Sequence, residues 1–553
     1  MTAVDDFLVS GSPQLAENAI DGGQAQWRQL LAVDPLGKLA KLSGSFALGL
    51  SMPDGSSWLA VDRFGIETIC YCIVDGKLGF AARADAFVNQ KEIDPQAIFD
   101  YLYFHCIPSP RTIYKDVYRL PPGHCAQFKN GQLTVKRFWQ PDFAPPATAE
   151  SFEGLKTDFK QRLQDSVARQ LDGTTPACFL SGGTDSSTIA GMIREVTGQA
   201  AHSYSIGFQA AGYDEMEYAR LAAKHFKTVH HEYYVTPDDL VRSIPAVAAA
   251  YDQPFGNSSA LPAYYCAKVA AENGVTRMLA GDGGDELFGG NSRYAKQKLF
   301  GWYQHLPATL RGRLLEPAFD SRIANRLPLV RKASSYIEQA RTPMPERLQM
   351  YNLLLRLGPE QVLTPDFLAQ VDQAAPLHHQ QQVWDQSPEA NDLNRSLAFD
   401  WRYTLAESDL PKVRVSSALA GMHVGYPMLD QAMLDFSLKL PDRHKLKGTQ
   451  LRWFFKEALR GFLPDEILTK KKQGFGLPFG VWLMRHKGLM GLARESLEQL
   501  GGRNIVQLLF IKDLFEKHLS QHPGYYGEMV WILMMLEQWL LKISPPKNHP
   551  VLI

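Results

Sequence analysis

The stretch Cys178-Phe179-Leu180-Ser181-Gly182-Gly183-Thr184-Asp185-Ser186-Ser187 decides the fold. Its apolar start predicts a buried strand, its glycines a tight turn, and the residues from about Ser186 onward a helix. Such a turn points backbone N–H groups and the positive end of a helix dipole at one place, which is the geometry that holds phosphate. Gly182 and Gly183 suit this use, because side chains there would keep the backbone away from phosphate oxygens or forbid a positive φ. We therefore expect an anion site.

Asp185 places a carboxylate where bare phosphate would be repelled. A metal ion between the two removes the conflict, and Mg²⁺ fits because it takes one or two carboxylates together with phosphate oxygens and water. The loop is not a Walker loop, since no G-x-x-x-x-G-K-[ST] occurs and no lysine lies in the turn. It resembles the Ser-Gly-Gly-x-Asp-Ser loop of the ATP pyrophosphatases, which cleave ATP between the α- and β-phosphates.

A second acidic turn, Gly281-Asp282-Gly283-Gly284-Asp285-Glu286, also follows a predicted buried strand. Three acidic groups on so short a turn repel one another unless cations hold them. A calcium-binding loop or a solvated turn is the alternative, but the Asp-x-Asp ladder of an EF-hand is missing from this stretch. The turn is therefore predicted to form the second part of the same metal and phosphate site.

Composition narrows the class of protein. A chain of 553 residues predicts two or three domains. Its 58 Lys and Arg balance 58 Asp and Glu, so no charge excess favours nucleic acid or a membrane surface, and a small-molecule or peptide substrate is expected. The six cysteines form no C-x-x-C pair, which indicates reduced thiols in the cytoplasm rather than a zinc ribbon or a disulfide framework. The acidic N-terminus has no apolar core, so we expect no secretory signal. The apolar run 529–536 is too short to cross a bilayer and is expected to form a buried C-terminal helix.

The first third of the chain predicts a small antiparallel sheet. Short apolar segments at 44–50, 58–62 and 78–82 are separated by turn residues. The stretch Asp62-Arg63-Phe64-Gly65-Ile66 and the Pro-rich segment 107–123 resemble the later part of the glutaminase domain of the asparagine synthetase family. That domain has an N-terminal-nucleophile fold whose catalytic cysteine is exposed by methionine removal.

Here the sequence departs from the glutaminase pattern. Position 2 is Thr2, no cysteine precedes Cys70, and the family's glutamine-binding stretches are not found. Thr2 could act through its own amine, but no glutamine pocket accompanies it. We expect residues 1–143 to form a degenerate, structural glutaminase-like domain whose first strands are shortened or missing.

Residues 144–553 are expected to form the second domain. After a linker and an amphipathic helix at about 150–170, strands such as 202–208 alternate with helices, which predicts an α/β fold with a parallel sheet and ligands at the carboxyl ends of its strands. The resemblance extends to Asp409-Leu410-Pro411-Lys412-Val413 and to the loop 470–478. It implies an ATP-pyrophosphatase domain of the adenine nucleotide alpha hydrolase-like type, followed by C-terminal helices.

The resemblance also implies site residues. Nucleotide contacts are expected from Leu180, Ser181, Gly182, Gly183, Asp185, Ser186, Ser205, Gly207, Gly281 and Gly283. Asp185 and Asp285 are expected to bind Mg²⁺. Lys472 matches the lysine that stabilises charge on the intermediate and on the departing phosphates. Asp282 is acidic as in asparagine synthetases, where β-lactam synthetases have tyrosine. His423 is either a base for the attacking amine or a structural histidine.

Two departures weaken the match to aspartate and ammonia as substrates. The chain has Arg414-Val415 and His423-Val424-Gly425 where the family usually has Asp-Arg and Glu-x-Arg. We predict an ATP-dependent ligase that activates a small-molecule or peptide carboxylate as an acyl-adenylate and transfers it to ammonia or an amine. A cyclase like the β-lactam synthetases or the ring-forming enzymes of lasso peptides is the alternative, and a non-catalytic nucleotide-binding protein is the second. The sequence leaves the oligomeric state open, with a homodimer among the options.

Overall fold

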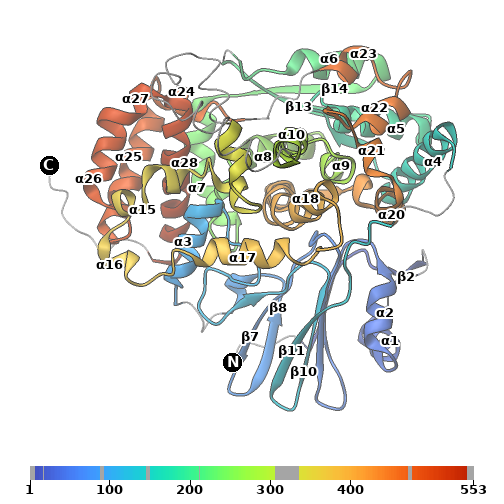
Figure 1. The fold of residues 1–553 in the computed structure, drawn as a ribbon, viewed down its shortest axis with the longest axis horizontal. Helices are drawn as coiled ribbons and strands as arrows, with labels where there is room; N and C mark the ends of the chain where they lie inside the picture. The colour runs from blue at the N-terminus through green and yellow to red at the C-terminus, as the bar shows by residue number, and fades with distance from the viewer. Residues whose placement is uncertain are drawn as a thin grey trace.

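The computed structural model describes residues 6–15, 18–20, 22–87, 92–144, 150–210, 212–305, 336–470 and 476–544. It contains an antiparallel β region followed by a parallel sheet with helices on both faces and a group of C-terminal helices (Figure 1). The predicted α/β class with an antiparallel first domain is confirmed. No helix in the described part of the chain combines the length and the apolarity needed to cross a membrane.

The first domain is built on two antiparallel sheets. The five-stranded sheet has the order β1-β5-β6-β10-β11, and the three-stranded sheet has the order β8-β7-β9. Their bounds are β1 Phe7–Gly11, β5 Phe46–Ser51, β6 Ser57–Val61, β7 Cys70–Val74, β8 Lys77–Ala81, β9 Tyr118–Arg119, β10 His124–Lys129 and β11 Gln132–Arg137. One face of the larger sheet packs on α1 (Gln24–Leu31) and α2 (Pro35–Lys41), and its other face packs on β7 and β8. Both faces are buried, so β5 and β6 are apolar except for Ser51 and Ser57, which pair with each other at the ends of the two strands.

The described strands before residue 45 agree only in part with the expected shortening, because β1 is as long as β6 and three others are short. β1 pairs along its five residues with β5. β2 (Gln14–Leu15), β3 (Asn18–Ala19) and β4 (Leu42–Ser43) have two residues each and form a separate small sheet.

The second domain contains a five-stranded parallel sheet of order β14-β13-β12-β15-β16. Its strands are β12 Ala177–Phe179, β13 His202–Phe208, β14 Val229–Val235, β15 Arg277–Leu279 and β16 His423–Gly425. On one face lie α4 (Phe152–Gln170), α5 (Thr184–Thr197) and α6 (Met216–Phe226), and on the other lie α7 (Pro237–Ala250) and α8 (Ala260–Glu272). The predicted parallel sheet is therefore present, and β12 lies at its centre.

The remaining helices complete the second domain. Their bounds are α9 Gly284–Phe288, α10 Ser292–His305, α14 Leu353–Leu357, α15 Pro359–Val362, α16 Pro365–Leu368, α17 Ala375–Trp384, α18 Asp392–Asp400, α19 Leu410–Leu419, α20 Gln431–Lys439, α21 Asp442–Lys445, α22 Trp453–Ala458, α23 Asp465–Thr469, α24 Phe479–Leu483, α25 Lys487–Gly502, α26 Leu508–Asp513, α27 Leu519–Gln521 and α28 Pro523–Ile543. A π-helical segment, Trp401–Asp409, joins α18 to α19. The apolar run 529–536 lies inside α28 and is buried, as predicted.

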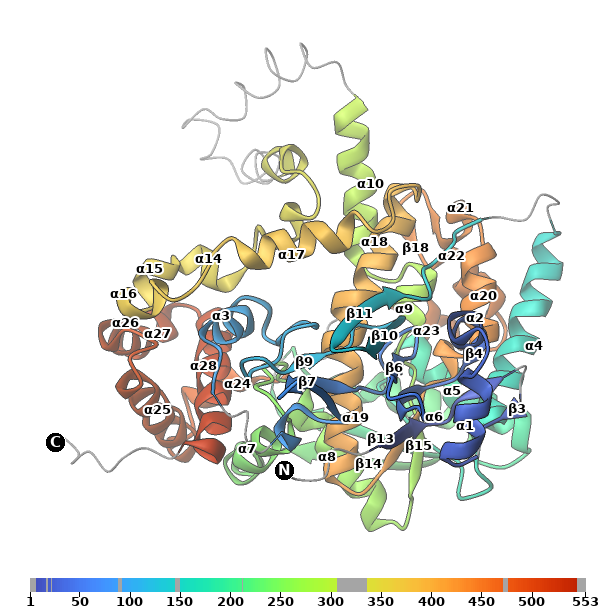
Figure 2. The same ribbon diagram turned by 90° about the horizontal axis from the view of Figure 1, so that it is seen from below.

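The two domains share one hydrophobic core. Helix α3 (Pro95–Phe104) of the first domain lies beside α28 in both views (Figures 1 and 2). The buried Tyr101 hydroxyl donates to the Ile532 carbonyl at 2.8 Å. Trp539 of α28 donates its indole N–H to the Tyr251 carbonyl at 3.1 Å, which joins α28 to the end of α7. The first domain is thus part of the scaffold that supports the second.

Glu407 connects the domains electrostatically. Its carboxylate is 3 % exposed and accepts hydrogen bonds from Arg119 Nη2 at 2.7 Å, from the Ser109 backbone and hydroxyl at 3.0 and 2.8 Å, and from Arg402. Burial alone would raise the pKa of this carboxyl, but Arg119 and Arg402 outweigh burial and lower the pKa to about 2. The carboxylate is therefore the shared partner of two buried arginines from different domains.

Replacing Glu407 should destabilise the protein. In Glu407→Gln the two guanidinium groups lose their counter-charge, and breaking a buried pair in this way costs roughly 3–5 kcal/mol of unfolding free energy. Urea unfolding monitored by fluorescence measures the change. Glu92→Gln is the control, since Glu92 pairs with Lys115 at 3.0 Å on the surface and its loss should leave the midpoint unchanged. Equal shifts in the two variants would contradict the role given to Glu407.

The contribution of Glu407 should also depend on pH. Its pKa falls from an ordinary value of 4.5 to about 2 in the folded protein, so the unfolded state binds a proton first as the pH drops. The stability difference between wild type and Glu407→Gln should be complete above pH 4.5 and shrink as the pH falls toward 2. Unfolding midpoints of both proteins across this range test the sign, and a difference that grows on acidification would show it to be wrong.

Candidate active site

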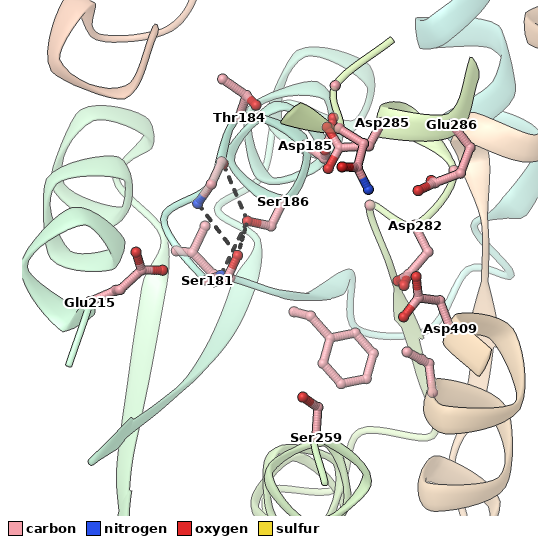
Figure 3. Close-up of a pocket in the computed structure, with 18 of the residues that line it drawn as sticks. Ser181, Thr184, Asp185, Ser186, Glu215, Ser259, Asp282, Asp285, Glu286 and Asp409 are labelled. Atoms are coloured by element: carbon pink, nitrogen blue, oxygen red, sulfur yellow. Dashed lines mark hydrogen bonds between the residues drawn. The ribbon is translucent and has the colours of Figure 1, made fainter. Parts of the chain in front are cut away.

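The two acidic turns lie side by side because they follow neighbouring parallel strands. β12 pairs with β15 through Cys178 and Leu279, and each strand leads through a turn into a helix, α5 or α9. Asp185 lies in the first turn of α5 and Asp285 in the first turn of α9, with their carboxyl groups close together (Figure 3). Strand order alone therefore brings residues from distant parts of the sequence to one point.

Arg452 joins the two carboxylates. Its Nη1 donates to Asp185 Oδ2 at 2.7 Å, to Asp285 Oδ1 at 2.9 Å and to the Thr184 hydroxyl at 3.0 Å, and its Nη2 donates to the other oxygen of Asp185. Arg452 is 4 % exposed and stacks on Phe455. Burial would lower its pKa, but the two aspartates outweigh burial and raise the pKa. The sequence analysis missed this arginine, which sits between short elements and in none of the motifs used.

A cavity of about 730 Å³ opens beside these turns at the carboxyl ends of the strands. The Ser181 to Ser186 loop forms one wall, where the Ser181 hydroxyl contacts Ser186 Oγ at 3.0 Å. An adjoining wall is largely apolar and consists of Phe179, Tyr204, Ile206, Pro262, Ala263 and Cys266. The cavity therefore combines an apolar slot with a polar loop at a helix N-terminus, which is suited to a ligand with a flat ring and an anionic tail.

Charge is unevenly distributed around the cavity. Among the described lining residues, Asp185, Asp285 and Glu215 face Arg452, Lys456 and Lys470, and Lys470 pairs with Glu215 at 3.1 Å. Asp282, Glu286 and Asp409 form a second group, which lies across the cavity from Glu215 (Figure 3), and Lys412 contacts Asp409 and Asp282. The first group is balanced, whereas the second is acidic.

The acidic group surrounds Lys412 of α19. Its Nζ lies 2.9 Å from Asp409 Oδ1 and 3.8 Å from Asp282 Oδ1. Burial would lower the pKa of Lys412, but Asp409 and Asp282 outweigh it and raise the pKa. Burial raises the pKa of Asp282 to about 6 against the attraction of Lys412. Burial and the neighbouring acids Asp285 and Asp409 raise the pKa of Glu286. With a pKa of about 6, the Asp282 carboxyl is mostly ionised at neutral pH.

The sequence was compared with models of known protein families. The sequence model described as Asparagine synthase matches residues 158–541, more than half of the chain. This chain belongs to the asparagine synthase family. A second model, described as Glutamine amidotransferase domain, matches residues 34–139. The family resemblance inferred from the motifs is confirmed, and the protein is a member of a family of ATP-dependent ligases.

Individual relatives have low sequence identity to this chain but align with large parts of it. An asparagine synthetase [glutamine-hydrolyzing] 1 of Bacillus subtilis is 25% identical over 90% of this chain and 78% of its own length. A putative asparagine synthetase [glutamine-hydrolyzing] 2 of Methanocaldococcus jannaschii is 33% identical over 45% of this chain and 50% of its own length. The amidase chyE of Penicillium rubens is 23% identical over 84% of this chain and 74% of its own length.

Most expected site residues of this asparagine synthase family member lie around the cavity. The lining includes Leu180, Ser181, Gly183, Asp185, Ser186, Gly281, Asp282, Gly283 and Asp285. Lys472 lies outside the described residues. The motif residues Asp409 and Lys412 line the cavity, as do Glu215 and Lys456, which the sequence analysis did not single out.

Ser205 and Gly207, which were expected to contact the nucleotide, are not among the residues that line the cavity. Adjacent residues of a strand point to opposite faces, and it is Tyr204 and Ile206 that face the cavity. Ser205 instead donates its hydroxyl to the Leu180 carbonyl. At Gly207 a Cβ would lie 2.6 Å from the Tyr234 ring. Both residues serve packing within the sheet.

His423 lies at the wrong end of its strand for the expected base. It starts β16 and pairs with Arg277, which starts the parallel strand β15, so it lies at the amino end of the sheet, whereas the cavity lies at the carboxyl end. Its side chain is exposed and is not part of the lining. The alternative structural interpretation of His423 is the one that this placement favours.

Gly182 has the positive φ that the sequence analysis gave as one reason for a glycine, and it also lies against helix α6. Its φ is +71°, and a Cβ there would lie 2.4 Å from the backbone nitrogen of Ala219 in α6. Gly182 thus allows helix α6 to pack against the turn. Gly283 has a φ of +98°, and a Cβ there would lie 2.2 Å from Cδ2 of Leu429.

Gly182→Ala should therefore destabilise more than a glycine replacement in open space. Gly173 has a similar φ of +80° but no atom within 4 Å of its Cβ position, so Gly173→Ala should cost only the roughly 1–2 kcal/mol of a left-handed alanine. Gly182→Ala should cost about 1–3 kcal/mol more, because α6 must move. The two midpoints of urea unfolding decide this, and equal losses would show that the close contact with α6 has no energetic weight.

Proposed function

We propose that this protein is an ATP-dependent carbon–nitrogen ligase that activates a carboxylate as an acyl-adenylate and transfers the acyl group to a nitrogen nucleophile. The observation that carries this proposal is the convergence of Asp185 and Asp285 at one edge of a cavity that has an apolar slot on one side and Lys412 with Asp282 on another. This arrangement provides separate places for a nucleotide base, a polyphosphate and an acyl substrate.

The donor set suits a magnesium nucleotide. The carboxylates of Asp185 and Asp285 point at one place, and two carboxylates are what Mg²⁺ commonly takes from a protein when phosphates supply its other ligands. A bound Mg²⁺ would neutralise phosphate charge there. The Ser181 to Ser186 loop would hold phosphate oxygens with its N–H groups and hydroxyls, and the apolar wall of Tyr204 and Ile206 would hold the adenine.

The proposed reaction has two steps. An oxygen of the substrate carboxylate attacks the α-phosphorus of ATP, the bond to the bridging oxygen of the β-phosphate breaks, and pyrophosphate leaves. The nitrogen nucleophile then attacks the acyl carbon, loses a proton, and expels AMP. Activation is needed because a free carboxylate is a poor electrophile. Asn257, Ser259 and Thr404 line the cavity near Asp409 and are the candidates for binding the acyl substrate.

Asp282 is the candidate proton acceptor in the second step. Its pKa of about 6 allows it to be ionised at neutral pH and still take a proton from an attacking amine. Lys412, which its acidic neighbours keep protonated, can stabilise negative charge on the acyl oxygen. The acidic character of this side of the cavity favours ammonium or a cationic amine as the nitrogen source.

The first domain gives no support for glutamine hydrolysis by a cysteine of this chain. All six cysteines are buried. Burial raises the pKa of each thiol, for example that of Cys125 to about 11, which opposes the thiolate form that a nucleophile needs. We therefore propose a structural role for this domain, a boundary at residues 143/144, and a nitrogen source other than its own glutaminase activity.

Acid-dependent exchange of labelled pyrophosphate into ATP tests the proposal. We expect exchange with one member of a panel of carboxylic acids that includes aspartate. Asp185→Ala should lose exchange, because the Mg²⁺ that would offset the phosphate charge loses one of its two carboxylate ligands. Asp282→Asn should retain exchange but lower amide formation about 10²–10⁴-fold, since it acts only after adenylation.

His423→Ala is the matched control and should retain both activities, because His423 is exposed at the opposite end of the sheet. Nucleotide binding without exchange for any acid would instead indicate a non-catalytic nucleotide-binding protein.

A further inference from the structure

Arg452 stands where the carboxylates of the acidic pair converge. The pair, defined as Asp185 and Asp285, directs oxygens at the same guanidinium nitrogen, Nη1, at 2.7 and 2.9 Å. The second nitrogen, Nη2, takes the other oxygen of Asp185. One side chain thus engages both oxygens of one carboxylate and one oxygen of the other.

This contact is built into the fold. Arg452 is 4 % exposed, its guanidinium lies 3.9 Å from the centre of the Phe455 ring, and its backbone is left-handed with φ +56°, which is uncommon outside glycine. Two glycines make room for the cluster. A Cβ on Gly284 would lie 2.2 Å from Asp185 Oδ1, and a Cβ on Gly290 would lie 2.7 Å from Arg452 Cδ. The surroundings are therefore shaped around the bridged pair.

A guanidinium and a metal ion compete for these carboxylates. Oxygens that accept short charge-assisted hydrogen bonds from Nη1 and Nη2 present their lone pairs to the arginine, and a cation placed at the point of convergence would be repelled by its charge. Phosphate oxygens change this balance, because a guanidinium binds phosphate as well as it binds carboxylate. A nucleotide in the loop could therefore take over Arg452 and leave the carboxylates to the metal.

We propose that Arg452 is a positioning residue that makes Mg²⁺ binding depend on the nucleotide: it neutralises the acidic pair in the nucleotide-free protein and passes to the phosphates when the nucleotide arrives. The protein then does not bind free Mg²⁺, and metal and nucleotide enter together. The inference rests on the proposed nucleotide site. It gives Arg452 one role before the nucleotide binds, which is to neutralise the acidic pair, and another afterwards, which is to bind the phosphates.

Calorimetric titration with Mg²⁺ tests this without any acyl substrate. Wild-type protein without nucleotide should show no binding heat at millimolar Mg²⁺, whereas Arg452→Met should bind Mg²⁺ at least about tenfold more tightly, because its carboxylates have lost a charged partner. Adding the ATP analogue with a methylene bridge between the α- and β-phosphates should enable the wild type to bind Mg²⁺. The double variant Arg452→Met, Asp185→Asn should lose the binding gained by Arg452→Met, which locates that site at the acidic pair.

Arg460→Met is the matched control. Arg460 lies on the same segment, is 55 % exposed, and pairs with Glu457 at 2.7 Å on the surface, so its replacement should leave Mg²⁺ binding as in the wild type. Arg452→Lys serves if the methionine variant does not fold. A lysine is a single point charge that cannot engage the three oxygens together, and it should give intermediate Mg²⁺ affinity.

The outcomes separate this inference from the proposed function. If nucleotide-free wild type binds Mg²⁺ as tightly as Arg452→Met does, or if folded Arg452 variants gain no Mg²⁺ affinity while the wild type binds Mg²⁺ with the analogue, the role of Arg452 is overturned and the nucleotide site stands. If the wild type binds neither the analogue nor Mg²⁺ in its presence, the nucleotide site itself is wrong.

Discussion

The parallel pairing of β12 with β15 is the constraint on which the site depends. One backbone register, Cys178 opposite Leu279, sets two acidic turns at the same height on neighbouring strands. Each turn leads directly into a helix, so both present a carboxylate beside a helix N-terminus. Bringing two such charges together is unfavourable without a cation, and Arg452 provides one within the chain. The acidic pair and its arginine are therefore one structural unit.

The cavity beside this unit separates two kinds of chemistry by charge. The side next to the Ser181 loop contains balanced acidic and basic residues and an apolar wall. It is the side proposed for the nucleotide. The side around Lys412 is acidic, which is suitable for a nitrogen nucleophile and its proton. Asp282 belongs to the acidic side, and it precedes Asp285 by three residues on the same turn. The sites proposed for activation and for transfer are therefore adjacent.

The first domain contributes through packing. Helix α3 shares a core with α28, and Glu407 ties Arg119 of the first domain to Arg402 of the second. Glu407 belongs to the π-helical segment that ends at Asp409, the partner of Lys412. The ion pairs between the domains are thus joined through a few residues of continuous helix to the lining of the cavity. This connection gives the first domain a structural role beside the site.

The sequence by itself determined the class of fold, the two acidic turns and the family. Those features are local: a strand, a glycine turn and a helix are encoded within ten residues around Ser181, and the same pattern recurs at Asp285. The sequence was less informative where a choice between the two faces or the two ends of a strand was needed. Ser205 and Gly207 belong to a strand whose alternate residues, Tyr204 and Ile206, face the cavity, and only sheet packing decides which set does so.

Tertiary structure decided the partners of the acidic residues. Arg452 is more than 260 residues from Asp185 in the sequence and meets it only because β18 (Gln450–Leu451) and α22 place it there. His423, which the sequence left as either a base or a structural histidine, starts a strand that runs parallel to β15, so it lies at the end of the sheet away from the cavity. Strand direction and charge pairing across long separations are properties of the packed chain, because they depend on which elements become neighbours.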